Sequence, residues 1–241
     1  MASESTLCRI FHEFCAWYTE VIYPKFVSVP KTRHELEKIM GPYIALGLNG
    51  ACGSTDAVHF SWGCCPSHLT NLHTGKEGIP TLAYNVTGNH DGSIIFCTAG
   101  TYGACNDKTL VRYDNFINEI RTNKWYKNIE YDLRISETVS VKEKGVYCIV
   151  DGGYHRWAST MSASRLLVEE NFVLWRKRME SVRKDIEDIF GVLKGRFRVL
   201  KLPILLHKKE QIDNMVFTCI GLHNMLHVWD KRDEWEAGKN R

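Results

Sequence analysis

Three acidic residues lie where carboxylate side chains could do chemistry together. Asp56 is the one charged residue in residues 51–60, an apolar run that predicts a strand. Asp151 directly follows residues 146–150, a run that is typical of a buried central strand. Glu187 adjoins the apolar stripe of a predicted long helix. Carboxylates near a core are costly unless they bind something, and clustered carboxylates repel one another until a cation relieves the repulsion.

The chemistry that such a set would support is metal-dependent phosphoryl transfer. Oxygen ligands suit Mg²⁺ or Mn²⁺ better than zinc. Two such ions can activate a water and stabilise the leaving oxygen when a phosphodiester bond is cut. We therefore predict that Asp56, Asp151 and Glu187 are both metal ligands and catalytic residues. The alternative for each acid is a structural role as a helix cap, a turn former or a salt-bridge partner.

Basic residues surround Glu187 in the sequence. Residues 165–209 hold 12 Lys and Arg against 6 Asp and Glu, although the whole chain carries only +3. Such a segment suits a polyanion, or it is a solvated helix face. The candidate DNA-binding residues are Arg183, Lys184, Lys194 and Arg196. Arg183 precedes Glu187 by four residues, and this spacing slightly favours a salt bridge over a phosphate contact.

The elements that must position these residues follow from hydrophobic periodicity and turn signals. Residues 1–48 predict a helical leader, with a second helix near Thr32, and residues 231–241 a polar tail. Between them we expect a hairpin over 81–98, a helix over 107–121, a long helix over 164–194 that Gly195 ends, and a last helix over 209–229. This order predicts one RNase H-like domain over 49–230, an α/β fold whose mixed sheet is flanked by helices.

Composition and cysteine usage exclude several classes of protein. The chain is 44% hydrophobic, which is ordinary for a soluble domain, and residues 215–229 are too few to span a membrane. Nine cysteines, two of them adjacent, make a poor disulfide framework and are expected to be reduced. The tripeptide Asn85-Val86-Thr87 fits the glycosylation pattern, which matters only in a secreted protein. A zinc site would need the set Cys52, Cys64, Cys65, His68 and His73, whose spacing matches no paired Cys-x-x-Cys motif.

Six segments stand in chain order around the three acids: residues 53–60 (GSTDAVHF), 75–81 (GKEGIPT), 103–107 (GACND), 150–154 (VDGGY), 183–197 (RKDIEDIFGVLKGRF) and 222–225 (LHNM). Together they resemble the PIF/Harbinger transposases of the plant-transposon-protein type. The resemblance implies a DDE transposase catalytic core in which Asp56, Asp151 and Glu187 bind Mg²⁺ or Mn²⁺. It also implies action on the double-stranded DNA of transposon ends, a nuclear location, a homo-oligomeric active form and a Myb-like DNA-binding partner.

Two further residues acquire expected roles from this resemblance. Asp107 would be an accessory polar residue, although its position favours a helix N-cap. His59 would orient a ligand or a phosphate, although a strand histidine is more often simply packed.

The chain departs from the family before its first acid. Members usually carry a helix-turn-helix region before the catalytic domain, and here only about 50 residues precede Asp56. An alternative function is therefore a domesticated or truncated transposase that binds DNA or a partner without catalysis.

Overall fold

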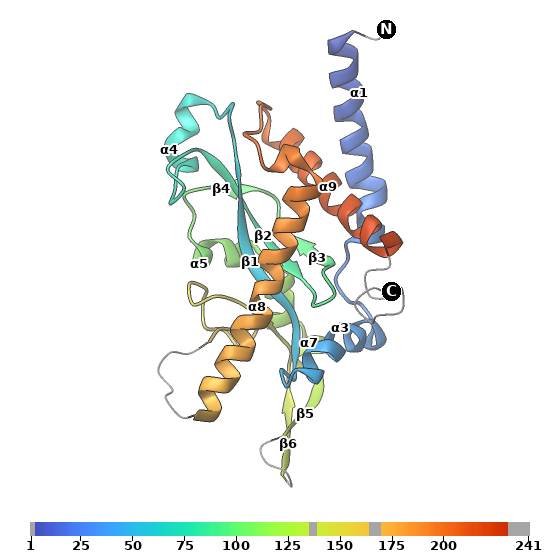
Figure 1. The fold of residues 1–241 in the computed structure, drawn as a ribbon, viewed down its shortest axis with the longest axis vertical. Coiled ribbons are helices and arrows are strands. Elements are labelled where there is room, and N and C mark those ends of the chain that lie inside the picture. Colours follow the sequence, from blue (N-terminus) through green and yellow to red (C-terminus); the bar gives the residue numbers. More distant parts are fainter. Residues whose placement is uncertain (1–2, 135–138, 164–169, 231–241) are drawn as a thin grey trace.

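A computed structural model describes residues 3–134, 139–163 and 170–230, and it shows a mixed sheet with helices on both faces (Figure 1). The central strand β1 (Ala51–Ser61) pairs antiparallel with β2 (Thr81–Gly88), which pairs antiparallel with β3 (Ile94–Cys97). On its other side β1 pairs parallel with β7 (Tyr147–Ile149), and β7 pairs parallel with β8 (Thr160–Met161). The short strand β4 (Thr101–Tyr102) also pairs with β2. The predicted α/β class is confirmed, and the order β3-β2-β1-β7-β8 is compatible with an RNase H-like fold.

The two long helices cover one face of this sheet. The helix α8 (Glu170–Arg196) crosses β1 in Figure 1, and α9 (Lys209–Asp230) lies beside it. The predicted stripe of α8 is buried: Ile186, Ile189 and Leu193 pack against Val58 and Phe60 of β1. Alternate residues of a strand face opposite sides of a sheet, and two-residue spacing therefore turns Val58 and Phe60 toward the same helix.

Shorter helices cover the opposite face. They are α3 (Arg33–Ala45), α5 (Asp107–Leu110), α6 (Asn115–Thr122) and α7 (Lys124–Lys127). Met40 of α3 and Ile117 of α6 join Cys52 and Cys148 in a second core cluster. A small helix, α4 (Thr70–His73), lies in the loop after β1.

The leader is helical as predicted. It comprises α1 (Glu4–Trp17), a π-helical turn (Tyr18–Ile22), α2 (Tyr23–Phe26) and α3. Thr32 caps α3, because its side chain accepts from the Glu35 amide while the Glu35 carboxylate accepts from the Thr32 amide. The domain boundary at residue 48 stays a prediction, and the tail 231–241 lies outside the described residues.

Three elements differ from the sequence predictions. The helix expected over 107–121 is divided, because the buried Asp114 side chain caps a new helix, α6, by accepting from the Ile117 amide. Two unexpected strands, β5 (Glu130–Arg134) and β6 (Ser140–Lys144), pair antiparallel. Gly195 does not end α8, which continues to Arg196. The expected start of that helix at 164 lies outside the described residues.

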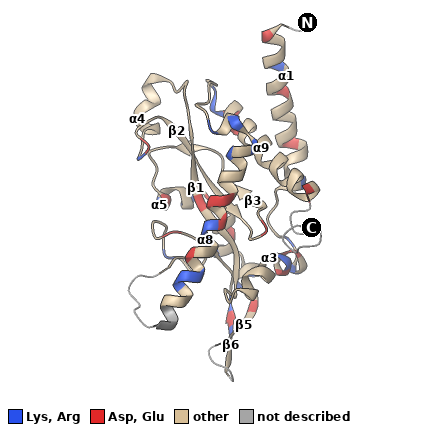
Figure 2. Ribbon diagram, viewed as in Figure 1, with Lys and Arg blue, Asp and Glu red and all other residues tan. Residues whose placement is uncertain are grey.

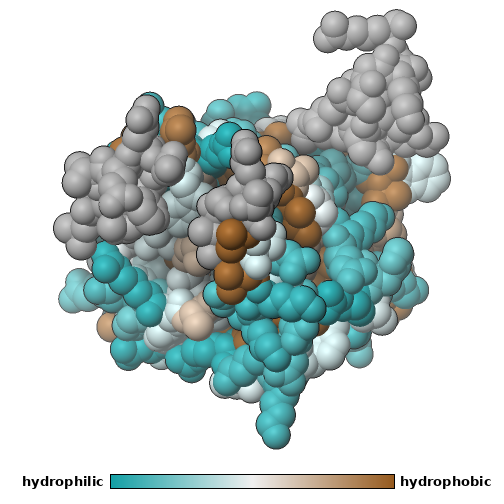
Figure 3. Space-filling view, turned by 90° about the horizontal axis from the view of Figure 1, so that it is seen from below, coloured by the Kyte–Doolittle hydropathy of each residue, from teal (hydrophilic) through white to brown (hydrophobic). Residues whose placement is uncertain are grey.

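The surface of the β5–β6 end of the molecule is mainly hydrophilic, with apolar side chains gathered in small areas (Figure 3). Among the described residues, no helix is long and apolar enough to cross a membrane.

Candidate functional site

The parallel pairing of β1 and β7 sets Asp56 and Asp151 beside each other. Ser54 of β1 is the register partner of Ile149 of β7. Asp56 and Asp151 each come two residues later, and parallel neighbours advance in the same direction. The Asp56 side chain is only 21% exposed and lies on the face of β1 toward α8, near Arg183. Asp151 lies in the loop that leaves β7. Two of the three predicted carboxylates are therefore neighbours.

Asp107 supplies another carboxylate next to Asp151. A Cβ atom at Gly153 would lie 2.6 Å from Asp107 Oδ2 and 2.9 Å from Asp151 Oδ1, so the two oxygens are no farther apart than the sum of these distances, 5.5 Å. The Gly153 amide donates to Asp151 Oδ1 at 2.7 Å, which fixes the loop. The prediction that Asp107 is an N-cap was wrong, because Asn106 caps α5 by accepting from the Thr109 amide. The side chain of Asp107 is left to face the acidic residues.

Glu187 reaches this cluster only through an arginine. Arg183 Nη1 lies 2.8 Å from Glu187 Oε1 and 3.9 Å from Asp56 Oδ2. The same guanidinium contacts Glu180 through Nε at 3.2 Å. Acidic and basic positions of α8 accordingly lie beside β1 in Figure 2. The salt bridge that the spacing of Arg183 and Glu187 favoured is confirmed.

Burial and the charge of Asp151 raise the pKa of both Asp56 and Asp107. Burial first, and then the charges of Asp151 and Asp107, raise the pKa of Asp56 to about 6, while the Ala57 amide and Arg183 lower it less. The pKa of Asp107 is also raised, by burial and by Asp151, against an opposing effect of Lys76. Arg183 lies too far from Asp56 to offset its burial. Negative charge is therefore under-compensated at this point of the fold, and a cation would stabilise it.

A stability prediction follows from the raised pKa of Asp56. The folded state retains this proton up to about pH 6, whereas the unfolded chain releases it near pH 4. The folded state therefore binds more protons in this window, and the wild type loses stability as pH rises through it. We expect Asp56→Asn to raise the free energy of unfolding by about 2 kcal/mol near pH 7.5 without divalent metal, and by almost nothing near pH 4.

Urea unfolding at both pH values measures this difference. Asp188→Asn, an exposed change on α8, serves as the control and should shift stability by less than ~0.5 kcal/mol. A less stable Asp56→Asn protein at neutral pH would show that Asp56 is held by favourable partners, as a structural acid is.

A buried polar network holds the loop that carries Asp151. The Tyr154 hydroxyl donates to Asn85 Oδ1 at 2.6 Å, and Asn85 Nδ2 donates to Asp114 Oδ2 at 2.6 Å. All three side chains are buried, and burial raises the pKa of Asp114 to about 6. The network ties the loop after β7 to β2 and α6. Asn85, which fits the glycosylation pattern, is fully buried in this fold and is not accessible to a glycan.

The basic candidates differ in their surroundings. Lys184 is exposed on α8. Lys194 lies over the Phe60 ring at 5.5 Å, and its burial lowers its pKa. Arg196 donates to Asp230 at 2.7 Å and to the His223 carbonyl at 3.2 Å, which gives it a structural contact within the chain.

The surroundings of His59 include Thr81 and one unpredicted residue, Lys76. His59 Nδ1 lies 3.0 Å from Thr81 Oγ1, and burial, followed by Lys76, lowers the pKa of His59. Lys76 affects the pKa of both His59 and Asp107, so it lies near each of them. The sequence placed Lys76 in a recognised segment without assigning it a role.

The donor set fits a hard cation by its chemistry. Asp56, Asp107, Asp151 and Glu187 offer carboxylate oxygens alone. The pKa of Asp56 and of Asp107 is raised by burial and by neighbouring carboxylates. Across the described residues, no group of three or more His, Cys, Asp or Glu side chains is already arranged to hold an ion. The zinc set is dispersed as well: Cys52 is in the core beside Cys148, and His73 Nδ1 contacts the Thr81 carbonyl.

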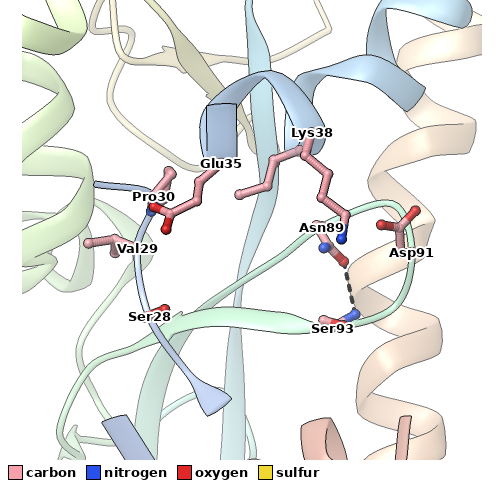
Figure 4. A pocket seen from close by; sticks show the side chains of 9 residues that line it. Ser28, Val29, Pro30, Glu35, Lys38, Asn89, Asp91 and Ser93 are labelled. Atoms are coloured by element: carbon pink, nitrogen blue, oxygen red, sulfur yellow. Dashed lines mark hydrogen bonds between the residues drawn. The ribbon is translucent and has the colours of Figure 1, made fainter. Parts of the chain in front are cut away.

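A separate hollow lies between α3 and the β2–β3 loop (Figure 4). Glu35, Lys38, Asn89 and Asp91 line it, and Asn89 Oδ1 accepts from the Ser93 amide. Glu35 already belongs to the capping box of α3, and Asn89 already accepts a hydrogen bond in the β2–β3 turn. None of the predicted site residues lines this hollow.

Comparison with known proteins identifies the family. Residues 24–235 match the family described as plant transposon protein. The chain belongs to this family. No curated protein and no solved structure matches it. The matched range contains every candidate residue of the acidic site, from Asp56 to Arg196, as well as α3 of the leader. Membership in the plant transposon protein family indicates a function related to transposition.

Proposed function

We propose that this chain is the catalytic domain of a Harbinger-type transposase, a divalent-metal-dependent DNA endonuclease and strand-transferase with an RNase H-like fold. The observation that carries the proposal is the convergence of Asp56, Asp151 and Asp107 from three separate segments, inside a plant transposon protein. The mixed strand order with Asp56 on the central strand supports the fold assignment.

In this proposal Asp56, Asp151 and Glu187 hold Mg²⁺ or Mn²⁺. When bound, the ions activate a water or a 3′-hydroxyl and stabilise the leaving oxygen of the phosphodiester. Asp107 adds negative charge beside Asp151. The Gly153 amide keeps the Asp151 carboxylate in one orientation, as its 2.7 Å hydrogen bond indicates.

Arg183 contacts two of the acids that this proposal assigns to the metal. Its guanidinium partly neutralises Asp56 and Glu187 at 3.9 and 2.8 Å. For Glu187 to become a ligand, Arg183 must leave both carboxylates. Glu180 lies on the outer side of Arg183 at 3.2 Å and offers a partner for the displaced side chain. In that position Arg183 can also donate to a DNA phosphate beside the metal site.

The DNA partner that fits is duplex DNA at transposon ends. Exposed Lys184 and half-buried Lys194 lie on the helix that carries Glu187, where phosphate contacts would position the scissile bond. Arg196 contributes less directly, because Asp230 already pairs with it. A Myb-like DNA-binding partner would supply sequence recognition, and a nuclear location follows from the proposed substrate.

The proposal is tested by incubating the purified chain with supercoiled plasmid and with a duplex that carries transposon ends. Nicking is expected with Mg²⁺ or Mn²⁺ and not with EDTA. Gel shift at several salt concentrations measures binding separately, because phosphate contacts make affinity fall steeply with salt.

A second candidate function is a binding module without catalysis. The contact of Arg183 with both Asp56 and Glu187 favours it, because a fixed guanidinium would exclude an ion from the acids. Salt-sensitive DNA binding without nicking, under every divalent ion tried, would establish this second function and refute the first.

A further inference from the structure

The helix α1 exposes an apolar stripe along a side that α9 does not cover. Leu7, Ile10, Phe14 and Trp17 are 58%, 52%, 43% and 50% exposed, and Val21, in the turn that follows, is 40% exposed. We call these five residues the outer stripe. A solvated helix normally turns such residues toward its own core, so exposure of five large apolar side chains in one row marks an interaction surface.

The adjoining side of α1 packs against α9. Cys15 and Tyr18 are buried, and the Cys15 carbonyl accepts from Thr218 of α9. A Cβ atom at Gly221 would lie 2.8 Å from the Tyr18 ring, so α1 and α9 are in close contact there. Figure 1 shows that the N-terminal part of α1 extends beyond the body of the molecule. The outer stripe therefore cannot be covered by α9.

The spacing of the outer stripe indicates which kind of element can pack against it. Its members step by three, four, three and four residues, which is the spacing by which one helix packs along another in a coiled coil. The partner is therefore a helix with an apolar row of the same period. Within the described residues, α8 and α9 bury their apolar rows in the core, and α1 alone presents one of this spacing outward.

The exposed area is close to what a dimer requires. If a large apolar side chain has a full surface of ~200 Å², the outer stripe and the adjoining Phe11 expose roughly 600 Å² per chain. Phe11 also borders a hollow formed with Val199, Leu202 and Leu205, which are 41%, 49% and 72% exposed. The outer stripe and Phe11 together therefore supply about three quarters of the ~800 Å² that each partner contributes to a standard interface, and the hollow extends the apolar surface beyond Phe11.

Charges beside the stripe select the orientation. Glu13 and Glu20 lie along one edge of the stripe, and Phe11 lies along the other. In a parallel pair the acidic edge of one helix meets the aromatic edge of its partner, whereas an antiparallel pair would bring the acidic edges together. We infer that the outer stripe of α1 is a homodimer interface, in which α1 of one copy packs parallel to α1 of a second copy. The inference is independent of the proposed nuclease function.

Sedimentation velocity on the full chain at 1–50 µM, a range chosen around the ~µM affinity of modest interfaces, tests the inference. The wild type is expected to be a dimer. The double variant Ile10→Glu, Trp17→Glu is expected to raise the dimer Kd by ~100-fold or more, because two charges would enter an apolar contact. Ser5→Glu, Ala16→Glu adds the same charges to exposed positions of the same helix, off the stripe, and is expected to leave the dimer intact.

A cysteine at position 10 tests the orientation. In a Cys8→Ser background, Ile10→Cys is expected to give a covalent dimer on mild oxidation, because residue 10 meets its own copy only in the parallel pair. Far-ultraviolet circular dichroism confirms that each variant is folded. Any one of three results would overturn the inference: a monomeric wild type, a dimer that survives the stripe variant, or no crosslink in the Ile10→Cys variant. A monomeric wild type would mean that the outer stripe binds another protein or another segment.

Discussion

Asp151→Asn is expected to reduce metal-dependent nicking of duplex DNA by ~10³-fold or more, since a bound ion contributes several kcal/mol to such a reaction. The amide keeps the size of the side chain and an oxygen that can still accept from the Gly153 amide at the 2.7 Å position. The loop should therefore hold its shape while one negative charge is lost. Initial rates of plasmid nicking in Mg²⁺ and in Mn²⁺ measure the effect.

The matching control for this variant is Asp185→Asn, an acid on α8 that contacts His90 outside the acidic cluster. It should retain nicking within about threefold, and both variants should bind duplex DNA with the affinity of the wild type, since binding depends on the basic residues. If Asp151→Asn nicked DNA at the wild-type rate, Asp151 would not be a ligand and the proposed triad would be wrong.

Gly153→Ala is expected to lower nicking by ~10²-fold, because displacing catalytic groups by about 1 Å can cost that much. The new methyl group would lie 2.6 Å from Asp107 Oδ2 and 2.9 Å from Asp151 Oδ1, which is closer than atoms can approach. Both carboxylates would have to move apart. The same rate assay, run beside a urea unfolding curve, separates this effect from a general loss of stability.

The neighbouring glycine provides a matched control. A Cβ atom at Gly152 would meet nothing within 4 Å, so Gly152→Ala should keep nicking within about twofold. Equal losses in the two variants would mean that loop flexibility, and not the spacing of Asp107 and Asp151, determines activity.

Most of the strands and helices that carry the site could be predicted from the sequence, because each has a local and repeated pattern of apolar residues or turn residues. The apolar run before Asp151 and the period of α8 each predicted their element, and the glycine-rich turn predicted the β2–β3 hairpin. A strand that carries Asp56 and a helix that carries Glu187 followed directly. The pairing of Arg183 with Glu187 followed from helical spacing.

What the sequence did not reveal depends on contacts between distant residues. Asp114 divides a predicted helix because it meets Asn85 of β2 in the core, and no local pattern records that contact. Strand β5 does alternate polar and apolar residues, with Tyr131 and Leu133 between charged residues, a signal that our prediction did not use. Its partner β6 is mostly charged and exposed and shows no such signal over its whole length. Asp107 looked like a helix cap because Asn106, which takes that role, stands beside it. The approach of Arg183 to Asp56 joins α8 to β1 and required the structure.

A crystal of the chain soaked in Mn²⁺, with anomalous scattering recorded at the manganese edge, tests the central claim most directly. The claim predicts a manganese peak bounded by Asp56 and Asp151, with Glu187 turned toward the ion and Arg183 moved away from Asp56. The opposite result is an absence of manganese at these acids at saturating concentration, with Arg183 still between Asp56 and Glu187. That result would contradict the metal-dependent nuclease.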